Sequence, residues 1–227
     1  MKVNINYSNR IIPIEIYANE HISNIIKNTN SFYEIKFLQY VSQNHNKHGT
    51  IIDIGANIGN HSLFFSEFLE YDKICCFEPF PQNASLCRTN LINKNCEIYE
   101  IALSNEDGEA TLYNSERGNY GGFSLVDYGS GMSFKVLDSV QTRTLDSYDI
   151  NNVSMIKLDA ENHELQILQG AKKTIIKNKP IIFLEDVSAV HPHLFARDRY
   201  DKYFADIGYI KKHINIHNYV DLWVPKK

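Results

Sequence analysis

A turn that contains glycines and begins with an acid is the first part of the chain suited to binding a ligand. Residues 53–62 read D-I-G-A-N-I-G-N-H-S and overlap the end of a short apolar run. Gly55 and Gly59 allow a tight turn and a close approach of a ligand to the main chain. The turn differs from the dinucleotide fingerprint G-x-G-x-x-G because Asp53 ends the strand and Asn57 stands where glycine is preferred. A carboxylate here disfavours a phosphate and favours a cationic ligand.

A second acid follows at the end of the next apolar run, in Phe77-Glu78-Pro79. Glu78 stands about 20 residues after the glycine turn, where Rossmann-like folds use an acid to bind a ribose diol. S-adenosylmethionine carries a ribose, a sulfonium and an ammonium group, and so suits both features. The alternative is structural: Asp53 caps the following helix, and Glu78 is a solvated acid at a strand end.

Three further acids follow later apolar runs, Asp159 after one and Glu185-Asp186 at the end of the next. Ligands of open α/β sheets bind beyond the carboxyl ends of the strands, so these acids are expected to converge at one site. For methyl transfer to a hydroxyl, a general base adds about 10²–10⁴-fold in rate. His163, which is largely neutral near pH 7, and Asp159 are the candidate bases. Asp159, His163 and Glu185 are therefore the predicted catalytic residues.

A metal site and a purely structural role are the alternatives for this group. Asp159, Glu185 and Asp186 offer hard oxygen ligands for Mg²⁺ or Mn²⁺, which would lower the pKa of a bound hydroxyl. In the structural alternative, Asp159 and Glu161 cap the next helix and His163 packs within it.

The elements that must position these residues follow from the apolar pattern. From residue 50 onward, short apolar runs alternate with helical stretches, which is typical of parallel strands with crossover helices. We expect an α/β, Rossmann-like fold, with residues 50–227 as the main domain and an antiparallel pair closing the sheet edge. The expected strands are residues 51–54, 73–77, 98–103, 155–158, 180–184, 209–214 and 219–224, and the helices are 60–69, 82–93 and 164–176.

Residues 1–49 precede this pattern and are expected to form an accessory element. Residues 3–17 alternate apolar and polar side chains and predict a hairpin. Residues 21–44 have helical spacing and predict two helices, with Ser31 as an N-cap and Glu34 three residues on.

Two segments are predicted to be functional loops. Residues 113–136 are rich in glycine, and a loop of this length in a compact domain is often a lid; Asn119 and Ser124 are its residues expected to reach cofactor or acceptor. The loop after residue 185 is expected to line the acceptor pocket, and its arginines would suit a phosphate. Its candidate residues are His191, His193, Phe195, Arg197 and Arg199.

Composition narrows the function classes. The chain has 227 residues and a formal net charge of -4, so no overall positive charge attracts nucleic acid. The four cysteines lack zinc-site spacing and are expected to be reduced. Neither a signal peptide nor an apolar stretch of about 18 residues is recognisable, which predicts a cytoplasmic protein.

Six motifs occur in an order typical of one family: D-I-G-A-N-I-G, F-E-P-F-P-Q-N, I-A-L-S, T-R-T-L-D-S, I-K-L-D-A-E-N-H-E-L-Q-I-L-Q-G-A and P-I-I-F-L-E. In these motifs the chain resembles FkbM-type S-adenosylmethionine-dependent methyltransferases. The resemblance implies a class I methyltransferase fold, a seven-stranded sheet with one antiparallel edge strand. One departure is Asn162, which stands where the family has glycine and can also adopt positive φ. The predicted cofactor-binding residues are Asp53, Gly55, Asn57, Gly59, Asn60, Glu78, Pro79, Ala102, Leu103, Ser104 and Asp159.

The function predicted from the residues and the resemblance is O-methylation of a sugar hydroxyl by S-adenosylmethionine. The acceptor is expected to be a small molecule, a nucleotide-activated sugar or a unit of a capsular or lipopolysaccharide glycan. An RNA methyltransferase is one alternative, disfavoured because no basic stripe with interleaved aromatics occurs. A non-catalytic S-adenosylmethionine-binding scaffold is another, and an NAD-dependent enzyme a third. The sequence indicates no particular oligomeric state.

Overall fold

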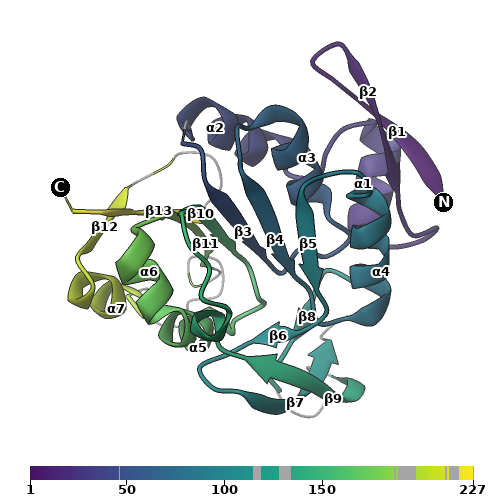
Figure 1. Cartoon of the computed structure of the whole chain (residues 1–227). Helices are drawn as coiled ribbons and strands as arrows, with labels where there is room; N and C mark the ends of the chain where they lie inside the picture. The colour runs from purple at the N-terminus through teal and green to yellow at the C-terminus, as the bar shows by residue number, and fades with distance from the viewer. Residues whose placement is uncertain are drawn as a thin grey trace.

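A seven-stranded sheet forms the centre of the computed structural model (Figure 1). The structure describes residues 1–45, 47–114, 119–127, 134–186, 188, 198–212, 214 and 220–226. In spatial order the strands are β12 (Tyr209–Lys212), β13 (Val220–Pro225), β11 (Ile181–Glu185), β10 (Val153–Leu158), β3 (Thr50–Ile54), β4 (Lys73–Phe77) and β5 (Cys96–Tyr99).

The four neighbouring pairs from β11 to β5 are parallel, as the apolar runs predict. All residues of β3 and β10 are buried, since helices cover both faces of the sheet. Only β13 runs antiparallel, and it lies between β11 and β12. The predicted fold class and C-terminal hairpin are confirmed, but the antiparallel strand is one position in from the edge, because the last strand of the hairpin pairs with β11.

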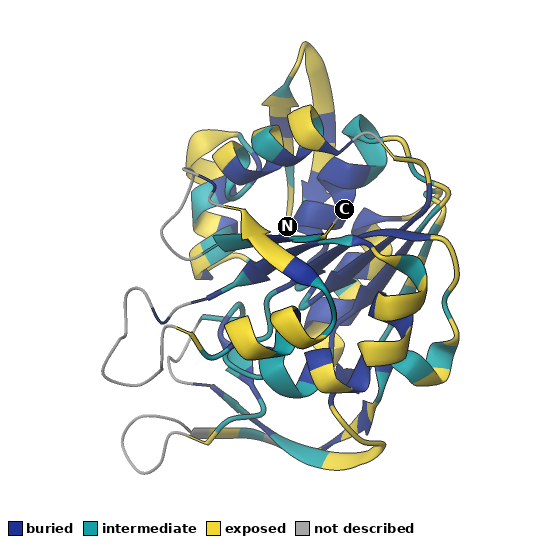
Figure 2. Cartoon of the chain, turned by 90° about the vertical axis from the view of Figure 1, so that its left-hand side faces the viewer, coloured by how far each residue is buried: buried dark blue, intermediate teal, exposed yellow. Residues whose placement is uncertain are grey.

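Two groups of helices cover the sheet, one on each face. Side chains alternate along a strand, so Ile51 packs in one core cluster and Ile52 in the other. Figure 2 shows these central strands in dark blue beneath helices with exposed outer faces. The helices are α1 (His21–Thr29), α2 (Ile35–Asn44), α3 (Asn60–Phe68), α4 (Pro81–Asn90), α5 (Glu164–Gly170), α6 (Lys172–Asn178) and α7 (Asp201–Asp206), with a 3₁₀ turn η1 (Leu145–Tyr148).

The N-terminal hairpin of β1 (Lys2–Tyr7) and β2 (Arg10–Glu15) is present as predicted and packs on the main sheet unit. Asn90 of α4 accepts a hydrogen bond from the Glu15 amide at 2.6 Å and donates one to its carbonyl at 2.9 Å. The predicted cap of the second helix is wrong: α2 begins after Glu34, and Ser31 does not cap it. The glutamate that caps a helix is Glu20, which accepts the Ile22 and Ser23 amides at the start of α1.

Two other expectations are corrected by a second, four-stranded sheet, of order β6-β9-β7-β8. The predicted strand 98–103 is split, since β5 ends at Tyr99 and β6 (Ala102–Leu103) pairs with β9 (Phe134–Arg143). Part of the predicted glycine-rich loop forms strands β7 (Gly108–Asn114) and β8 (Phe123–Ser124). Leu112 and Val140 give this sheet a small apolar core with Phe80, which the loop prediction overlooked. Residues 115–118 and 128–133 lie outside the described residues.

The predicted helix 164–176 is two helices, α5 and α6, which meet at Ala171. Gly170 lies against the chain after β6, where a Cβ atom would come within 2.0 Å of the Ser104 carbonyl oxygen. The break therefore brings α5 close to the end of β6. Within the described residues, no helix combines the length and apolar character needed to cross a membrane.

Candidate active site

The turn after β3 crosses the carboxyl ends of two neighbouring strands. The Gly55 and Ala56 amides donate to the Phe77 carbonyl at 3.0 and 3.1 Å. Gly55 has φ 72°, and a Cβ atom there would come within 1.8 Å of the Asp159 carbonyl oxygen. Only glycine therefore fits between β3 and the chain that leaves β10.

Glu78 is held at the end of β4 by two backbone amides. Its Oε2 accepts from the Asn57 amide at 2.8 Å, and its Oε1 accepts from the Phe80 amide at 2.9 Å. Burial raises the pKa of Glu78 to about 7. The Asn83 side chain also bonds this carboxylate, which has about four acceptor positions when ionised, so one remains for a ligand such as a ribose diol.

One open cavity of about 1080 Å³, its mouth included, joins this turn to the acids after β10 and β11. The predicted site residues that line it are Gly55, Asn57, Asn60, Glu78, Pro79, Ala102, Leu103, Asp159, His163 and Glu185.

Four predicted residues do not line the cavity, namely Asp53, Gly59, Ser104 and Asp186. Asp53 is fully buried below the turn and accepts a hydrogen bond from Ser62 Oγ at 2.6 Å, contrary to the expectation that it contacts the ligand. A Cβ atom on Gly59 would lie 3.0 Å from Cys87 Sγ, so this glycine allows close packing of α3 on α4. These two residues shape the turn from behind.

Lys157, which the sequence prediction missed, lies beneath the same turn. Its Nζ donates to the Gly55 carbonyl at 3.0 Å and lies 3.1 Å from Asp159 Oδ2 and 3.6 Å from Asp53 Oδ1. Burial alone would lower the pKa of Lys157, but the charges of Asp159 and Asp53 raise it above its usual value. The detectable signal was a lysine inside the apolar run Met155-Ile156-Lys157-Leu158, since such a charge needs a partner when buried.

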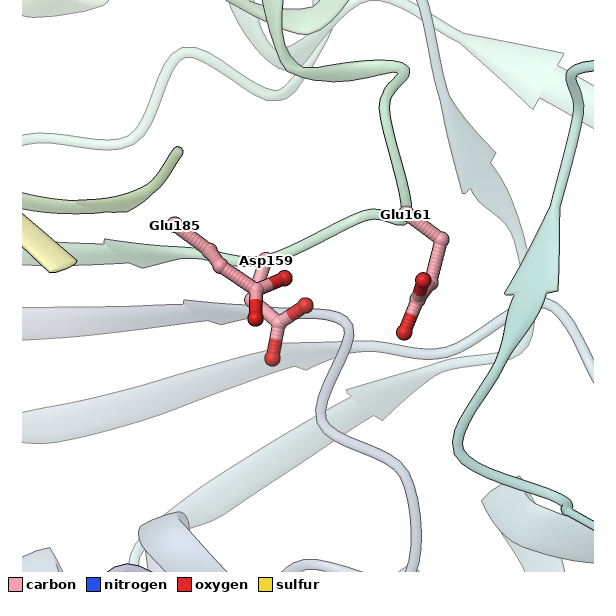
Figure 3. A group of neighbouring side chains, drawn as sticks. All are labelled: Asp159, Glu161 and Glu185. Carbon is pink, nitrogen blue, oxygen red and sulfur yellow. The ribbon is translucent and has the colours of Figure 1, made fainter. Parts of the chain in front are cut away.

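Figure 3 shows Asp159, Glu161 and Glu185 projecting into one space from the ends of β10 and β11. Ligand oxygens of the three side chains lie within 4.8 Å of one another. Burial alone would raise the pKa of Asp159, but Lys157 and a hydrogen bond with Glu185 lower it. Burial and the neighbouring acids raise the pKa of Glu161 to about 8, and they also raise that of Glu185.

The structure changes the membership of the predicted metal-binding group. Asp186 accepts the Ser188 amide at 3.0 Å and pairs with Arg199 at 3.4 Å, outside the cavity lining. Glu161 takes its place beside Asp159 and Glu185. Lys157 already compensates the charge of Asp159, so this carboxylate does not depend on a divalent ion for its charge balance.

His163 directly precedes α5 and lines the cavity next to the chain that follows β6. Its Nε2 is 3.0 Å from Ser104 Oγ, and burial lowers its pKa to about 4. His163 is therefore neutral at pH 7 and is a weak proton acceptor.

The second sheet and the N-terminal helices contribute lining residues that the sequence prediction missed. Tyr120 and Gly121 line the cavity, whereas Asn119 and Ser124 support the surrounding loops. Ser124 Oγ donates to the Glu161 carbonyl at 2.5 Å. Arg199 contacts Asn162; the other candidate residues of its loop, at positions 191, 193, 195 and 197, lie outside the described residues.

Two further lining residues that the sequence prediction missed form a pair: Glu34 Oε2 lies 3.2 Å from His61 Nε2.

Comparison with known proteins identifies a methyltransferase family. The family model described as the methyltransferase FkbM domain matches residues 53–211. A curated relative, the 2-O-methyltransferase NoeI of Sinorhizobium fredii, is 26% identical over 146 residues. That alignment covers 57% of this chain and 60% of the relative, so the match spans less than two thirds of its length.

Two solved structures share the fold. The methyltransferase FkbM of Methylobacillus flagellatus superposes with a TM-score of 0.58 at 16% identity. The superposition covers 83% of this chain and 47% of the chain of that structure. A putative transferase of Pyrococcus horikoshii superposes with a TM-score of 0.54 at 12% identity. The superposition covers 100% of this chain and 72% of the chain of that structure. At these identities the two structures support the architecture alone.

Proposed function

Because the chain belongs to the FkbM methyltransferase family, we propose that it transfers a methyl group from S-adenosylmethionine to a sugar hydroxyl in the cytoplasm. The acceptor is a nucleotide-activated sugar or a unit of a surface glycan. The observation that carries the proposal is that one cavity joins the Gly55–Glu78 region to a cluster of carboxyl groups. The 2-O-methyltransferase relative supports oxygen as the accepting atom.

The residues around the glycine turn fit S-adenosylmethionine. Glu78 keeps acceptor capacity for a ribose diol, and Gly55 lines the same cavity. Four further residues line this cavity and would complete the donor site: Asn57, Pro79, Ala102 and Leu103. When bound, S-adenosylmethionine supplies an electrophilic methyl group on a positively charged sulfur.

Asp159 is the group we assign to the acceptor hydroxyl. As the carbon–oxygen bond forms and the carbon–sulfur bond breaks, the hydroxyl proton passes to the Asp159 carboxylate. Lys157 and Glu185 keep that carboxylate ionised and fix its direction. We assign the role to Asp159 and not to His163 because of position: Asp159 lies with Glu161 and Glu185 in the cavity, whereas His163 Nε2 lies 3.0 Å from Ser104 Oγ.

The proposal is tested by incubating the protein with S-adenosylmethionine labelled in its methyl group and three sets of acceptors. These are neutral glycosides, nucleotide sugars and total RNA. Label in a sugar fraction, stable to base as an ether is, supports the proposal. Label confined to RNA, or no transfer to any sugar, would contradict it.

Replacing Glu78 with glutamine is expected to weaken binding of S-adenosylmethionine and S-adenosylhomocysteine about 10- to 100-fold. The substitution exchanges a charged acceptor for a neutral one, and hydrogen bonds to charged groups contribute about 1.5–3 kcal/mol. Calorimetric titration measures the effect. Glu100→Gln is the matched control, because Glu100 is exposed and pairs with Arg88 away from the cavity. Equal affinities for Glu78→Gln and the control would remove Glu78 from the donor site.

The preference for S-adenosylmethionine over S-adenosylhomocysteine is expected to rise between pH 6 and pH 8. Glu161, with a pKa of about 8, is largely protonated at the lower pH, and a positive sulfur bound beside it favours the ionised form. Binding then releases a proton, which strengthens affinity by up to about tenfold per pH unit. Glu78 titrates with either ligand, so the ratio of the two affinities isolates the sulfonium.

Calorimetry at the two pH values gives this ratio directly. Glu161→Gln is expected to flatten its pH dependence while leaving S-adenosylhomocysteine binding nearly unchanged. A ratio in the unsubstituted protein that does not change with pH would show that the sulfonium is not bound beside these acids.

A further inference from the structure

Glu34 and His61 line the same cavity as the acid cluster of Asp159, Glu161 and Glu185. Glu34 directly precedes α2, and His61 lies in the first turn of α3. Both side chains are largely buried, with 14% and 8% of their surface exposed, and both line the cavity that contains Asp159. A smaller adjoining hollow is lined by Glu34 together with Asp159 and Glu185. Glu34 and His61 therefore border the space in front of the proposed proton acceptor.

The protein holds this pair in place with specific contacts. The Tyr33 amide donates to Asn60 Oδ1 at 3.0 Å, and Asn60 Nδ2 donates back to the Tyr33 carbonyl at 3.2 Å. Asn60 thereby ties the chain before α2 to the start of α3, although the sequence assigned it to the cofactor. Glu34 has φ 54°, a left-handed backbone conformation that is uncommon for a non-glycine residue and recurs at ligand sites.

The charge of Glu34 is set by its surroundings. Burial alone would raise the pKa of Glu34, but the contact with His61 outweighs it and the pKa lies below its usual value. Asp159 raises the pKa of Glu34, whereas Lys157 lowers it. An ionised Glu34 beside His61 offers one strong acceptor and one imidazole ring to the same ligand group.

The cavity lining disfavours an acidic acceptor at this end. Its described acids include Glu34, Asp159, Glu161 and Glu185, and its one described lysine or arginine is Lys157. Lys157 is 4% exposed and is already engaged by Asp159 and the Gly55 carbonyl. Carboxylates accept hydrogen bonds from hydroxyl groups, whereas a second carboxylate or a phosphate would be repelled.

We propose that Glu34 and His61 form the acceptor subsite and bind a second hydroxyl of a sugar ring that carries no acidic group, next to the hydroxyl that faces Asp159. This inference rests on the proposed sugar O-methylation and adds the charge class of the acceptor and the residues that select it. Glu34 lies outside the family match, which begins at residue 53, so the N-terminal helices supply a specificity determinant to the family domain.

The test compares neutral methyl hexosides and 6-deoxyhexosides with methyl glucuronide, by following S-adenosylhomocysteine release. The unsubstituted protein is expected to have a kcat/KM at least tenfold higher for its best neutral glycoside than for the glucuronide. Glu34→Gln and His61→Gln are expected to raise the KM for the neutral glycoside about 10- to 100-fold, the effect of losing a hydrogen bond to a charged group. The KM for S-adenosylmethionine should change less than about twofold, because neither residue is assigned to the donor.

A second readout separates selection from a loss of structure. Glu34→Gln removes a negative charge and should narrow the gap between neutral glycoside and glucuronide, which general destabilisation would not do. Glu70→Gln is the control, because Glu70 forms the same type of contact with His48 at 3.2 Å on the exposed surface. An unchanged acceptor KM in both cavity variants, or a preference of the unsubstituted protein for the glucuronide, would overturn the inference alone. Turnover of no glycoside would instead overturn the proposed function, and the inference with it.

Discussion

Methyl transfer by an Asp159→Asn variant is expected to be about 10²–10⁴-fold slower than by the unsubstituted protein, the usual contribution of a general base. Asparagine has nearly the same shape as aspartate but cannot take up the hydroxyl proton. The effect should fall on kcat, because the proton moves only as the transition state forms. Initial rates with saturating S-adenosylmethionine and a neutral acceptor measure it.

Two controls make this result specific to proton transfer. The affinity of Asp159→Asn for S-adenosylhomocysteine, measured by calorimetry, should stay within about threefold of normal. This change is smaller than the loss of one hydrogen bond to a charged group would cause. Asp149→Asn should leave the rate unchanged, because Asp149 is exposed and pairs with Lys177, and neither residue lines the cavity. A rate loss of less than about tenfold in Asp159→Asn would show that this carboxylate is not the base.

Lys157→Met is expected to lower the free energy of unfolding by about 3–5 kcal/mol, the cost of leaving a buried charge without its partner. Lys157 and Asp53 are 4% and 0% exposed, and the ammonium group also bonds the Gly55 carbonyl that shapes the turn. For a chain of 227 residues, each kcal/mol corresponds to about 2–4 °C in Tm, so the Tm should fall by about 10 °C.

A second substitution shows whether charge is the cause. Adding Asp53→Asn to Lys157→Met removes the fully buried one of the two carboxylates that Lys157 compensates, so part of the lost stability should return. Lys177→Met is the surface control and should cost less than about 1 kcal/mol, as exposed ion pairs do. No recovery in the double variant would show that the loss came from packing and not from the buried pair.

The strands that build the site were predictable because burial on both faces of a parallel sheet leaves continuous apolar runs in the sequence. The glycine turn and Glu78 were predictable because each directly follows such a run, and the carboxyl ends of parallel strands share one edge. The antiparallel C-terminal pair was predictable from its two short runs, although its order in the sheet depends on which strand meets β11.

The missed features depend on contacts between distant segments. Asp53 and Lys157 are 104 positions apart in two different motifs, and the pairing of β3 with β10 places them opposite each other. Glu34 reaches the cavity because Asn60 binds the Tyr33 backbone, a contact that no local pattern encodes. Part of the second sheet was read as a loop because residues 113–136 contain five glycines and few apolar residues at regular spacing.

The most direct test of the account is calorimetric titration of the unsubstituted protein with S-adenosylmethionine, S-adenosylhomocysteine and NAD. The account predicts one site per chain that binds the first two in the micromolar range and NAD much more weakly, because Glu78 suits a ribose whereas the surrounding acids repel a pyrophosphate. Preferential binding of NAD, or no binding of either S-adenosyl compound, would contradict the central claim that this cavity is a methyl-donor site.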